Sequence, residues 1–193
     1  LTMVTRNGTV KRLPVETLKN LRNNGIRALN LDEGDELVSV RETDGEQKIL
    51  IATHDGMAVV FDETDVRAMG RTATGVCGMK PDDDGQDEVV GMIVVNDPKT
   101  ESVMVVSQEG YGKRSEVEDY RMTRRGAKGV KTLNITEKTG KLVAIKNVTD
   151  DNDLMIINQS GIVIRMAVAE VRVMGRNTQG VRLINLTKKN DVI

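Results

Sequence analysis

The feature that most constrains this chain is a pattern that occurs four times along its 193 residues. Each copy has a short apolar run, a turn that ends in glycine, and a second β-prone run. Turns such as Asn7-Gly8 and Asp55-Gly56 favour tight β-hairpins, because their backbone needs positive φ angles. The turns end at Gly8, Gly56, Gly110 and Gly161, with spacings of 48, 54 and 51 residues. Repetition at this period predicts a chain built from one recurring structural unit.

A second glycine follows the first after 17 residues in the first repeat and after 19 in the other three. These second glycines are Gly25, Gly75, Gly129 and Gly180. Each leads into a third β-prone run, and a polar turn then leads into a fourth. The runs are short and rich in Val and Ile, and none keeps a helical period over three turns. The pattern therefore predicts four strands per repeat, with at most one helical turn in Val15–Leu21 and in Glu63–Met69.

The ranges of the expected strands follow from these runs. The first strands are expected at Leu1–Thr5, Ile49–Thr53, Val103–Ser107 and Leu154–Asn158. The second strands are expected at Thr9–Leu13, Met57–Phe61, Tyr111–Arg114 and Ile162–Met166. The third strands are expected at Ile26–Leu31, Val76–Met79, Val130–Ile135 and Val181–Leu186, and the fourth at Glu36–Val40, Glu88–Val95 and Lys141–Val148. The last repeat stops at residues 191–193, where its fourth strand is expected to begin.

Four strands per repeat at this period are typical of a propeller-like array, in which each blade packs only on its neighbours. We therefore predict an all-β fold of about four four-stranded antiparallel blades in a partial ring. The blades are expected at residues 1–48, 49–102, 103–153 and 154–193, the last one truncated. A gene duplication without a ring is the alternative, but single four-stranded units of this size rarely stand alone. Because both ends fall within strands, we expect the chain to be a piece of a larger array.

The amino-acid composition restricts which residues can form the core and which cellular compartment is expected. Aromatic residues make up 2% of the chain, so the core must rest on Val, Ile, Leu and Met, and an aromatic base-stacking surface is not expected. The single cysteine, Cys77, has no partner for an internal disulfide and is expected to be a small core residue. No run of 18 or more apolar residues and no signal peptide is present, which predicts a soluble cytoplasmic protein without a membrane partner.

The net charge of −1 hides a strong segregation of charge along the chain. From each first glycine to two residues past the second, the four repeats together carry +10, and the rest of the chain carries −11. In a blade array, equivalent residues take equivalent places, so these windows are expected to form one basic stripe along an edge. Such a stripe predicts a polyanionic partner, bound through its phosphates with little regard to base sequence. The alternative interpretation is that these are ordinary solvated surface charges.

The candidate DNA-binding residues are the basic side chains of these windows. They are Lys11, Arg12, Arg22, Arg27, Lys113, Arg114, Arg121, Arg124, Arg125, Lys128, Lys131, Arg165, Arg176 and Arg182. The second repeat, with acidic Asp62, Glu63 and Asp65, is expected to be the weak part of the stripe. Reversing Lys113, Arg114, Arg124 and Arg125 to Glu is expected to weaken DNA binding and leave the fold intact.

The repeats resemble those of a known family, the C-terminal domain of the bacterial DNA gyrase A protein. The resemblance runs the whole length of the chain in the right order. The motifs that carry it are Gly8-Thr9-Val10-Lys11-Arg12, Met69-Gly70-Arg71 before Gly75-Val76, Gly110-Tyr111-Gly112-Lys113-Arg114, and Met174-Gly175-Arg176 before Gly180-Val181. The related domain of topoisomerase IV is similar but generally less regular, so it ranks second.

The resemblance implies a β-pinwheel of about six blades, with a strand exchanged between neighbours and duplex DNA bent around a basic perimeter. It implies membership of an A2B2 complex with the rest of the gyrase A protein and with the gyrase B protein, which uses ATP and Mg²⁺ elsewhere to introduce negative supercoils. No cofactor is expected in this chain. The family's gyrase box, a Gln-Arg-Arg-Gly-Gly-Lys-Gly segment, is absent, and residues 124–129 are a partial echo of it.

Catalytic chemistry is not indicated by any motif. Residues 110–114 lack the distant Gly and the Ser or Thr of a phosphate-binding loop, and the acidic run at 82–85 lacks the spacing of a calcium loop. His54 is the only histidine, so a metal site or a histidine-based triad has no partner. Tyr111 and Tyr120 lack the context of a topoisomerase nucleophile, which the resemblance places outside this chain.

A protein-interaction propeller is the alternative function from another class. A docking face of that kind needs apolar or aromatic anchors, which this composition scarcely supplies. An enzyme built on the ring ranks third, because the sequence holds no convergent set of acid, base or metal ligands.

Overall fold

The structure is a computed structural model that describes residues 1–82, 84–186 and 191–193. Each repeat opens with a hairpin: β1 Thr2–Thr5 with β2 Thr9–Arg12, β4 Lys48–Thr53 with β5 Met57–Asp62, β8 Ser102–Ser107 with β9 Tyr111–Glu116, and β12 Asp153–Ile157 with β13 Val163–Ala167. A single 3₁₀ turn follows each hairpin: η1 Val15–Leu18, η2 Glu63–Asp65, η3 Val117–Asp119 and η4 Val168–Glu170. No helix in the described part is long and apolar enough to cross a membrane.

The strands after the hairpins divide into two kinds. Short third strands, of two residues each, are β6 Val76–Cys77, β10 Val130–Lys131 and β14 Val181–Arg182. Longer fourth strands are β3 Leu37–Arg41, β7 Val89–Val95 and β11 Leu142–Val148. The described residues form three four-stranded sheets, in the orders β3-β1-β2-β6, β10-β5-β4-β7 and β11-β8-β9-β14, and the hairpin β12-β13. All the pairings between these strands are antiparallel, as the sequence predicted.

Each third strand comes from one repeat but joins the sheet of the preceding repeat. β6 pairs with β2 through Thr9 and Val10, β10 pairs with β5, and β14 pairs with β9. This is the strand exchange that the family resemblance implied. The expected third strand at Ile26–Leu31 is wrong, since these residues are not extended into a ladder. Its partner in this pattern would be the second strand of a preceding repeat, and the described residues contain no such strand.

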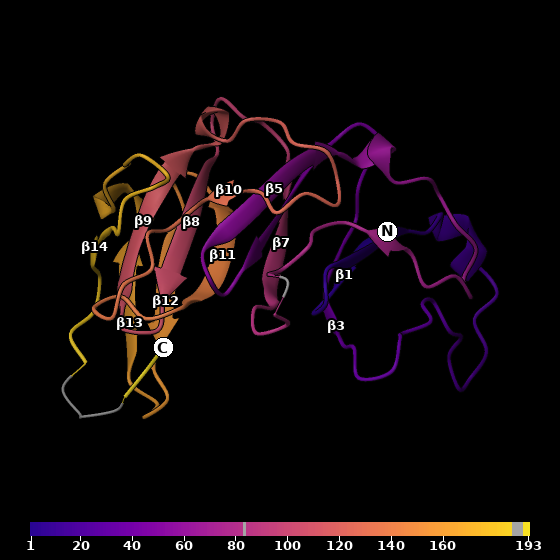
Figure 1. Cartoon of the computed structure of the whole chain (residues 1–193), viewed down its shortest axis with the longest axis horizontal. Coiled ribbons are helices and arrows are strands. Elements are labelled where there is room, and N and C mark those ends of the chain that lie inside the picture. Colours follow the sequence, from indigo (N-terminus) through magenta and orange to yellow (C-terminus); the bar gives the residue numbers. More distant parts are fainter. Residues whose placement is uncertain (83, 187–190) are drawn as a thin grey trace.

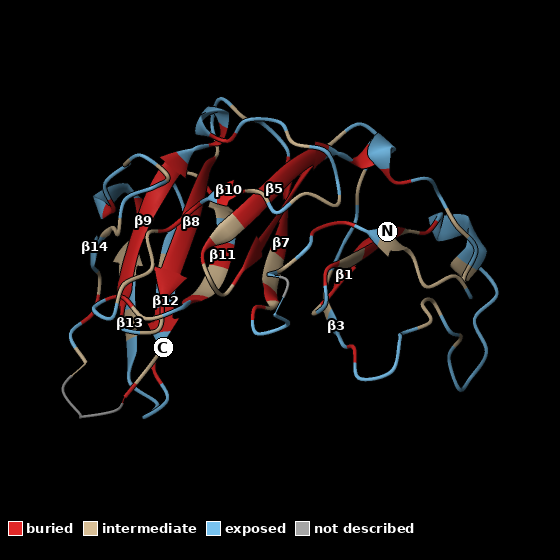
Figure 2. Cartoon of the chain, in the orientation of Figure 1, coloured by how far each residue is buried: buried red, intermediate tan, exposed pale blue. Residues whose placement is uncertain are grey.

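The four repeats follow one another along an arc (Figure 1). The fourth strands β3, β7 and β11 contact one another in succession and lie at the inner edge of the sheets. The third strands lie at the opposite edge, and the η turns with the loops after them follow the outside of the arc, where Figure 2 shows mostly exposed and half-buried residues. The outer loops are therefore the part of each repeat that a long partner can reach.

The core is built between repeats, from aliphatic side chains. One buried cluster joins the first two repeats, with Val10 and Ile51 among its members, and a second joins the middle two repeats around Leu50 and Val105. A smaller cluster around Met104 and Val168 joins the third and fourth repeats. Because each sheet buries its faces against its neighbours, the array is stabilised joint by joint, as expected for a repeat protein.

Six of the eight recurring glycines, all except Gly25 and Gly161, are required by these joints. Gly8 accepts hydrogen bonds at its carbonyl from the backbone N–H groups of Gly78 and Met79, and a Cβ on Gly8 would lie 2.2 Å from the Met79 oxygen. Gly75 has φ +120°, and a Cβ there would lie 2.6 Å from the Val10 oxygen. The first glycine of one repeat and the second glycine of the next are thus the points where two backbones touch, which explains why both recur.

We predict that Gly129→Ala strongly destabilises the protein, while Gly34→Ala does so only mildly. Both glycines have positive φ, +87° and +77°, but only at Gly129 would a Cβ meet a backbone atom, the Ala58 oxygen at 2.2 Å. The expected loss in the free energy of unfolding is about 1 kcal/mol for Gly34→Ala and at least about 3 kcal/mol for Gly129→Ala. Urea denaturation measures both values, and equal losses would contradict the close-approach explanation.

Candidate nucleic-acid interface

An equivalent arginine forms the outer contact of every joint between repeats. It stands four residues before the second glycine in the second, third and fourth repeats. In each case its Nη1 atom donates a hydrogen bond to the backbone oxygen two residues after the second glycine of the preceding repeat. The three bonds run from Arg71 to Arg27 at 3.3 Å, from Arg125 to Cys77 at 3.3 Å, and from Arg176 to Lys131 at 2.8 Å.

The backbone repeats the same joint. The N–H group five residues after each second glycine donates to a carbonyl oxygen two residues before the second glycine of the next repeat. These bonds run from Asn30 to Ala73 at 3.3 Å, from Lys80 to Ala127 at 3.2 Å, and from Asn134 to Thr178 at 3.0 Å. Successive outer loops are therefore fixed side by side, from the first repeat to the fourth.

These contacts arrange seven positions in order along the outside of the arc. We call them the outer row: Arg27, Arg71, Cys77, Arg125, Lys131, Arg176 and Arg182. Six of the seven are cationic, and all seven are exposed or half-buried. Arg182 is further fixed by the Tyr111 ring, whose centroid lies 5.3 Å from the guanidinium carbon. The row, interrupted at Cys77, gives the structure a series of positive side chains at equivalent places, which is suited to phosphate groups.

The comparison with known proteins identifies the family. The family model described as "DNA gyrase C-terminal domain, beta-propeller" matches residues 1–44, 47–96, 101–149 and 152–193. The chain belongs to the DNA gyrase A C-terminal domain family. The identification made from the sequence motifs is therefore confirmed.

Individual relatives agree with this assignment. The DNA gyrase A protein of Staphylococcus aureus (strain MRSA252) is 44% identical over 186 residues, which cover 96% of this chain and 21% of that protein. A solved gyrase A C-terminal domain is 25% identical with a TM-score of 0.86, covering 99% of this chain and 62% of the other. A solved C-terminal domain of DNA topoisomerase IV is 26% identical with a TM-score of 0.91, and the match covers 99% of this chain and 59% of the other. The fold is the predicted β-pinwheel, and the chain spans about a fifth of its gyrase A relatives.

Two lysines that the sequence placed on the basic edge of this gyrase A C-terminal domain are inside it. Lys11 is 1% exposed and Lys113 is 0% exposed. The Lys11 ammonium donates to the backbone oxygens of Ala28, Arg71 and Ala73, at 2.6, 2.8 and 2.9 Å. It therefore fastens the outer loop of the second repeat onto the first.

Lys113 has the same role at the joint between the third and fourth repeats. It donates to the backbone oxygens of Gly175 and Arg176 and to the Thr178 hydroxyl. Burial lowers the pKa of the Lys113 ammonium to about 8, with a further contribution from the Arg176 guanidinium. Burial also lowers the pKa of Lys11.

The arginines that follow these lysines also bind the next repeat. Arg12 donates from Nη1 to the Val66 oxygen at 2.9 Å, and Arg114 donates from Nε to the Val171 oxygen at 2.8 Å. Arg114 is buried and also pairs with Asp150. The sequence-based placement of Lys11, Lys113 and Arg114 on an exposed edge is thus wrong, because all three are buried and each donates to at least one backbone carbonyl of the neighbouring repeat. Replacing Lys113 or Arg114 by Glu would disturb the fold, so such changes cannot report on DNA contact.

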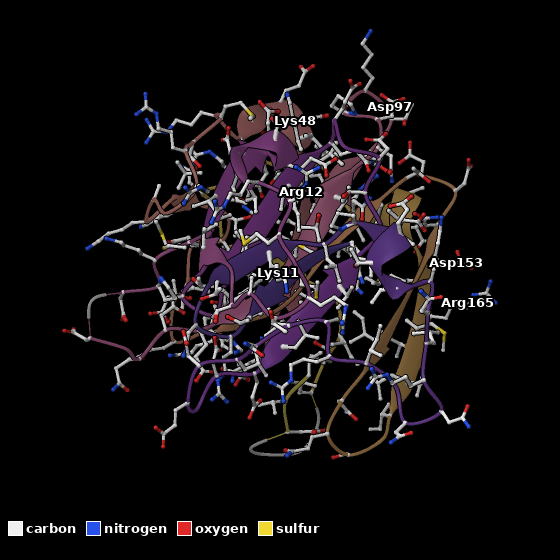
Figure 3. The ribbon with its side chains drawn as sticks, turned by 90° about the vertical axis from the view of Figure 1, so that its right-hand side faces the viewer. Lys11, Arg12, Lys48, Asp97, Asp153 and Arg165 are labelled. Carbon is white, nitrogen blue, oxygen red and sulfur yellow. The ribbon has the colours of Figure 1, made fainter. Side chains whose placement is uncertain are left out.

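The remaining candidates divide between the outer loops and other surfaces. Arg22, Arg121 and Arg124 are exposed on the outer loops of the first and third repeats. Arg165 is paired with Asp153 on the β12-β13 hairpin (Figure 3). Lys128 lines a hollow that also contains Asp55, Asp82 and Asp87.

The second repeat differs from its sequence-based description at two residues. Glu63, expected as surface charge, is fully buried and accepts hydrogen bonds at Oε1 from the backbone N–H groups of Gly45 and Gln47. Its other oxygen lies 3.2 Å from Nε of Arg12. Cys77, expected in the core, is exposed and takes the outer-row place that basic residues occupy in the other repeats.

Sequence reasoning missed Arg71, which is the cation that the second repeat supplies to the outer row. Counting positions back from the second glycine would have found it, because Arg71, Arg125 and Arg176 share the same offset. The acidic residues of the second repeat had directed attention away from it.

Tyr120 and His54, which the sequence analysis considered for catalytic roles, are both held by hydrogen bonds. Tyr120 is 4% exposed, its hydroxyl bonds that of Thr132, and burial raises its pKa to about 12. The His54 ring lies 2.7 Å from the Leu142 oxygen in the hairpin turn. Within the described residues, His, Cys, Asp and Glu do not gather in any group of three or more that could hold a metal ion. Asp83, from the acidic run considered as a calcium loop, lies outside the described residues.

We predict that Lys113→Met lowers the free energy of unfolding by about 1–3 kcal/mol, because the Gly175 and Arg176 oxygens lose their buried donor. Lys146→Met is the control, since Lys146 is exposed on β11 and its replacement is expected to change stability by less than about 0.5 kcal/mol. Chemical denaturation measures both. Unchanged or increased stability of Lys113→Met would show that the joint does not depend on this ammonium.

Proposed function

We propose that this chain binds duplex DNA along its outer row, without regard to base sequence, and bends the duplex around the arc. The observation that carries the proposal is the series of cations held at equivalent places in successive repeats by equivalent hydrogen bonds. Cations that are fixed in register can contact phosphates repeatedly as a duplex passes. Base edges are not needed for such contacts, so binding depends on charge and shape.

Bending explains why the cations belong on a stiff scaffold. A sharp bend in 20–30 base pairs of DNA costs on the order of 1–6 kcal/mol, which several phosphate contacts together must offset. Outer-row guanidiniums that are already hydrogen-bonded to the backbone lose little further freedom when they bind. The buried Lys11 and Lys113 support this arrangement by holding the loops in place, with no contact to DNA.

We further infer the role of the whole protein from the family. The chain acts as the DNA-wrapping part of a gyrase A protein, in an A2B2 complex with the gyrase B protein in the bacterial cytoplasm. Strand cleavage and ATP hydrolysis, with its Mg²⁺, belong to parts of the enzyme outside this chain. The family membership and the 44% identity to a gyrase A protein support this inference.

A salt titration with two matched variants tests the proposal. The first variant replaces by Gln the outer-row residue Lys131 and two exposed arginines of the same repeat's outer loop, Arg121 and Arg124, and the control replaces exposed Lys48, Lys99 and Lys146 by Gln. We predict that wild-type affinity for a plain duplex falls steeply with salt. The first variant should lose roughly 10- to 100-fold in affinity and about two units of salt slope, because up to three phosphate contacts are removed.

The control variant is expected to bind like the wild type, because its three lysines belong neither to the outer row nor to the outer loops. Fluorescence anisotropy with duplexes of unrelated sequence measures all three proteins. The proposal is wrong if wild-type binding ignores salt, if it selects one short sequence, or if the control loses as much affinity as the outer variant. A wild-type chain that does not bind duplex DNA at all would favour the protein-interaction scaffold.

A further inference from the structure

The joint between the first two repeats lacks one hydrogen bond that the other joints have. Arg125 donates from Nε to the Asp65 oxygen at 2.9 Å, and Arg176 donates from Nε to the Asp119 oxygen at 3.0 Å. Asp65 and Asp119 both stand nine residues after the first glycine of their repeats, and Thr17 has that position in the first repeat. Among the hydrogen bonds of the described residues, none runs from Arg71 to Thr17, and the Arg71 guanidinium keeps only its 3.3 Å bond to the Arg27 oxygen.

The cause lies in the length of the loop. The two glycines of the first repeat are 17 residues apart, against 19 in the other repeats. The shorter loop closes in a tight turn, in which the Gly25 N–H bonds the Arg22 oxygen at 2.8 Å. The Thr17 carbonyl, which would accept a hydrogen bond from Nε of Arg71, is therefore displaced, and a space opens between the two repeats.

This space is a hollow of about 450 Å³ whose lining includes three arginines. Arg22 and Arg27 reach it from the first repeat and Arg71 from the second, with Thr17 also on its wall. Of the described residues that line it, three are arginines and none is acidic. Nη1 of Arg27 donates a hydrogen bond to the Asn30 side chain at 3.1 Å, which holds Arg27 beside the hollow.

Three guanidinium groups around one hollow repel one another, and an anion between them relieves that repulsion. The guanidinium fork matches the oxygens of a phosphate group and can donate two parallel hydrogen bonds to it. Elsewhere in the outer row the equivalent arginines, Arg125 and Arg176, are each held by two backbone oxygens. The first joint is thus the place in the outer row where several arginines can converge on one ligand.

We propose that this hollow is a phosphate-binding pocket that holds a backbone phosphate of the bound duplex and anchors the DNA at the first joint. The inference rests on the proposed function, since DNA is the source of the phosphate. It goes beyond that function by assigning one pocket and by requiring arginine, where the rest of the outer row requires only positive charge.

An arginine-to-lysine comparison tests the pocket. The double variant Arg22→Lys, Arg27→Lys keeps the charge of the pocket and removes two guanidinium groups that can each donate two parallel hydrogen bonds. The double variant Arg121→Lys, Arg124→Lys is the matched control on the outer loop of the third repeat. We expect the pocket variant to lose about tenfold in affinity for duplex DNA, with its salt slope unchanged, and the control to lose less than about twofold. Denaturation curves of both variants should match the wild type. Equal losses in the two variants would overturn the pocket.

A second measurement does not depend on DNA. Inorganic pyrophosphate is added to the chain while amide NMR shifts are followed. The expected result is a saturable shift at Gly25, Ile26 and Arg27, absent when Arg22 and Arg27 are replaced by Gln. DNA binding without this shift and without the arginine preference overturns the pocket and leaves the proposed function standing. Pyrophosphate binding by a chain that does not bind DNA overturns the proposed function, and with it DNA as the source of the phosphate.

Discussion

The contact between successive repeats is the interaction on which the rest of this structure depends. Each joint combines a two-residue strand given to the preceding sheet, a close approach of backbones at glycine, and a shared aliphatic core. A single repeat lacks all three, so it cannot bury its own faces. The curvature of the array and the order of the outer loops both follow from repeating this joint.

Positive charge serves two different purposes in this protein. Inside the joints, Lys113 donates its three hydrogen bonds to the neighbouring repeat, Lys11 donates two to the neighbouring repeat and one to Ala28 of its own, and both side chains are buried. Outside the joints, the outer row keeps its cations exposed or half-buried. Arg71, Arg125 and Arg176 connect the two purposes, since each guanidinium binds the preceding repeat and each side chain is also exposed or half-buried. Stability and the proposed DNA contact therefore depend on the same loops.

Much of the fold could be predicted from the sequence, because hairpins are local. The Gly8, Gly56, Gly110 and Gly161 turns set the register of their strands within a residue or two of the expected ranges. The third strands were predicted too long, and residues 26–31 are not a strand at all, because pairing there depends on the neighbouring repeat. An apolar run in the sequence does not indicate how many of its residues will pair with a neighbouring strand.

The candidate site was predictable as a region and not residue by residue. The charge windows located the outer loops correctly, but charge alone could not separate Lys113, which is buried, from Lys131, which is exposed. Both lysines stand at regular distances from a recurring glycine, and only the three-dimensional contact between repeats shows that the Lys113 side chain is the one inside. The same limit explains Glu63, whose burial depends on an arginine and two backbone N–H groups from other segments.

Hydrogen–deuterium exchange of the chain with and without a plain duplex tests the central claim most directly. If DNA lies along the outer row, amide exchange should slow in the outer loops at residues 66–77, 119–131 and 170–182. It should stay unchanged in the loops at 42–47, 96–101 and 149–152, which connect the repeats. Slower exchange in these connecting loops, with none in the outer ones, would contradict the account.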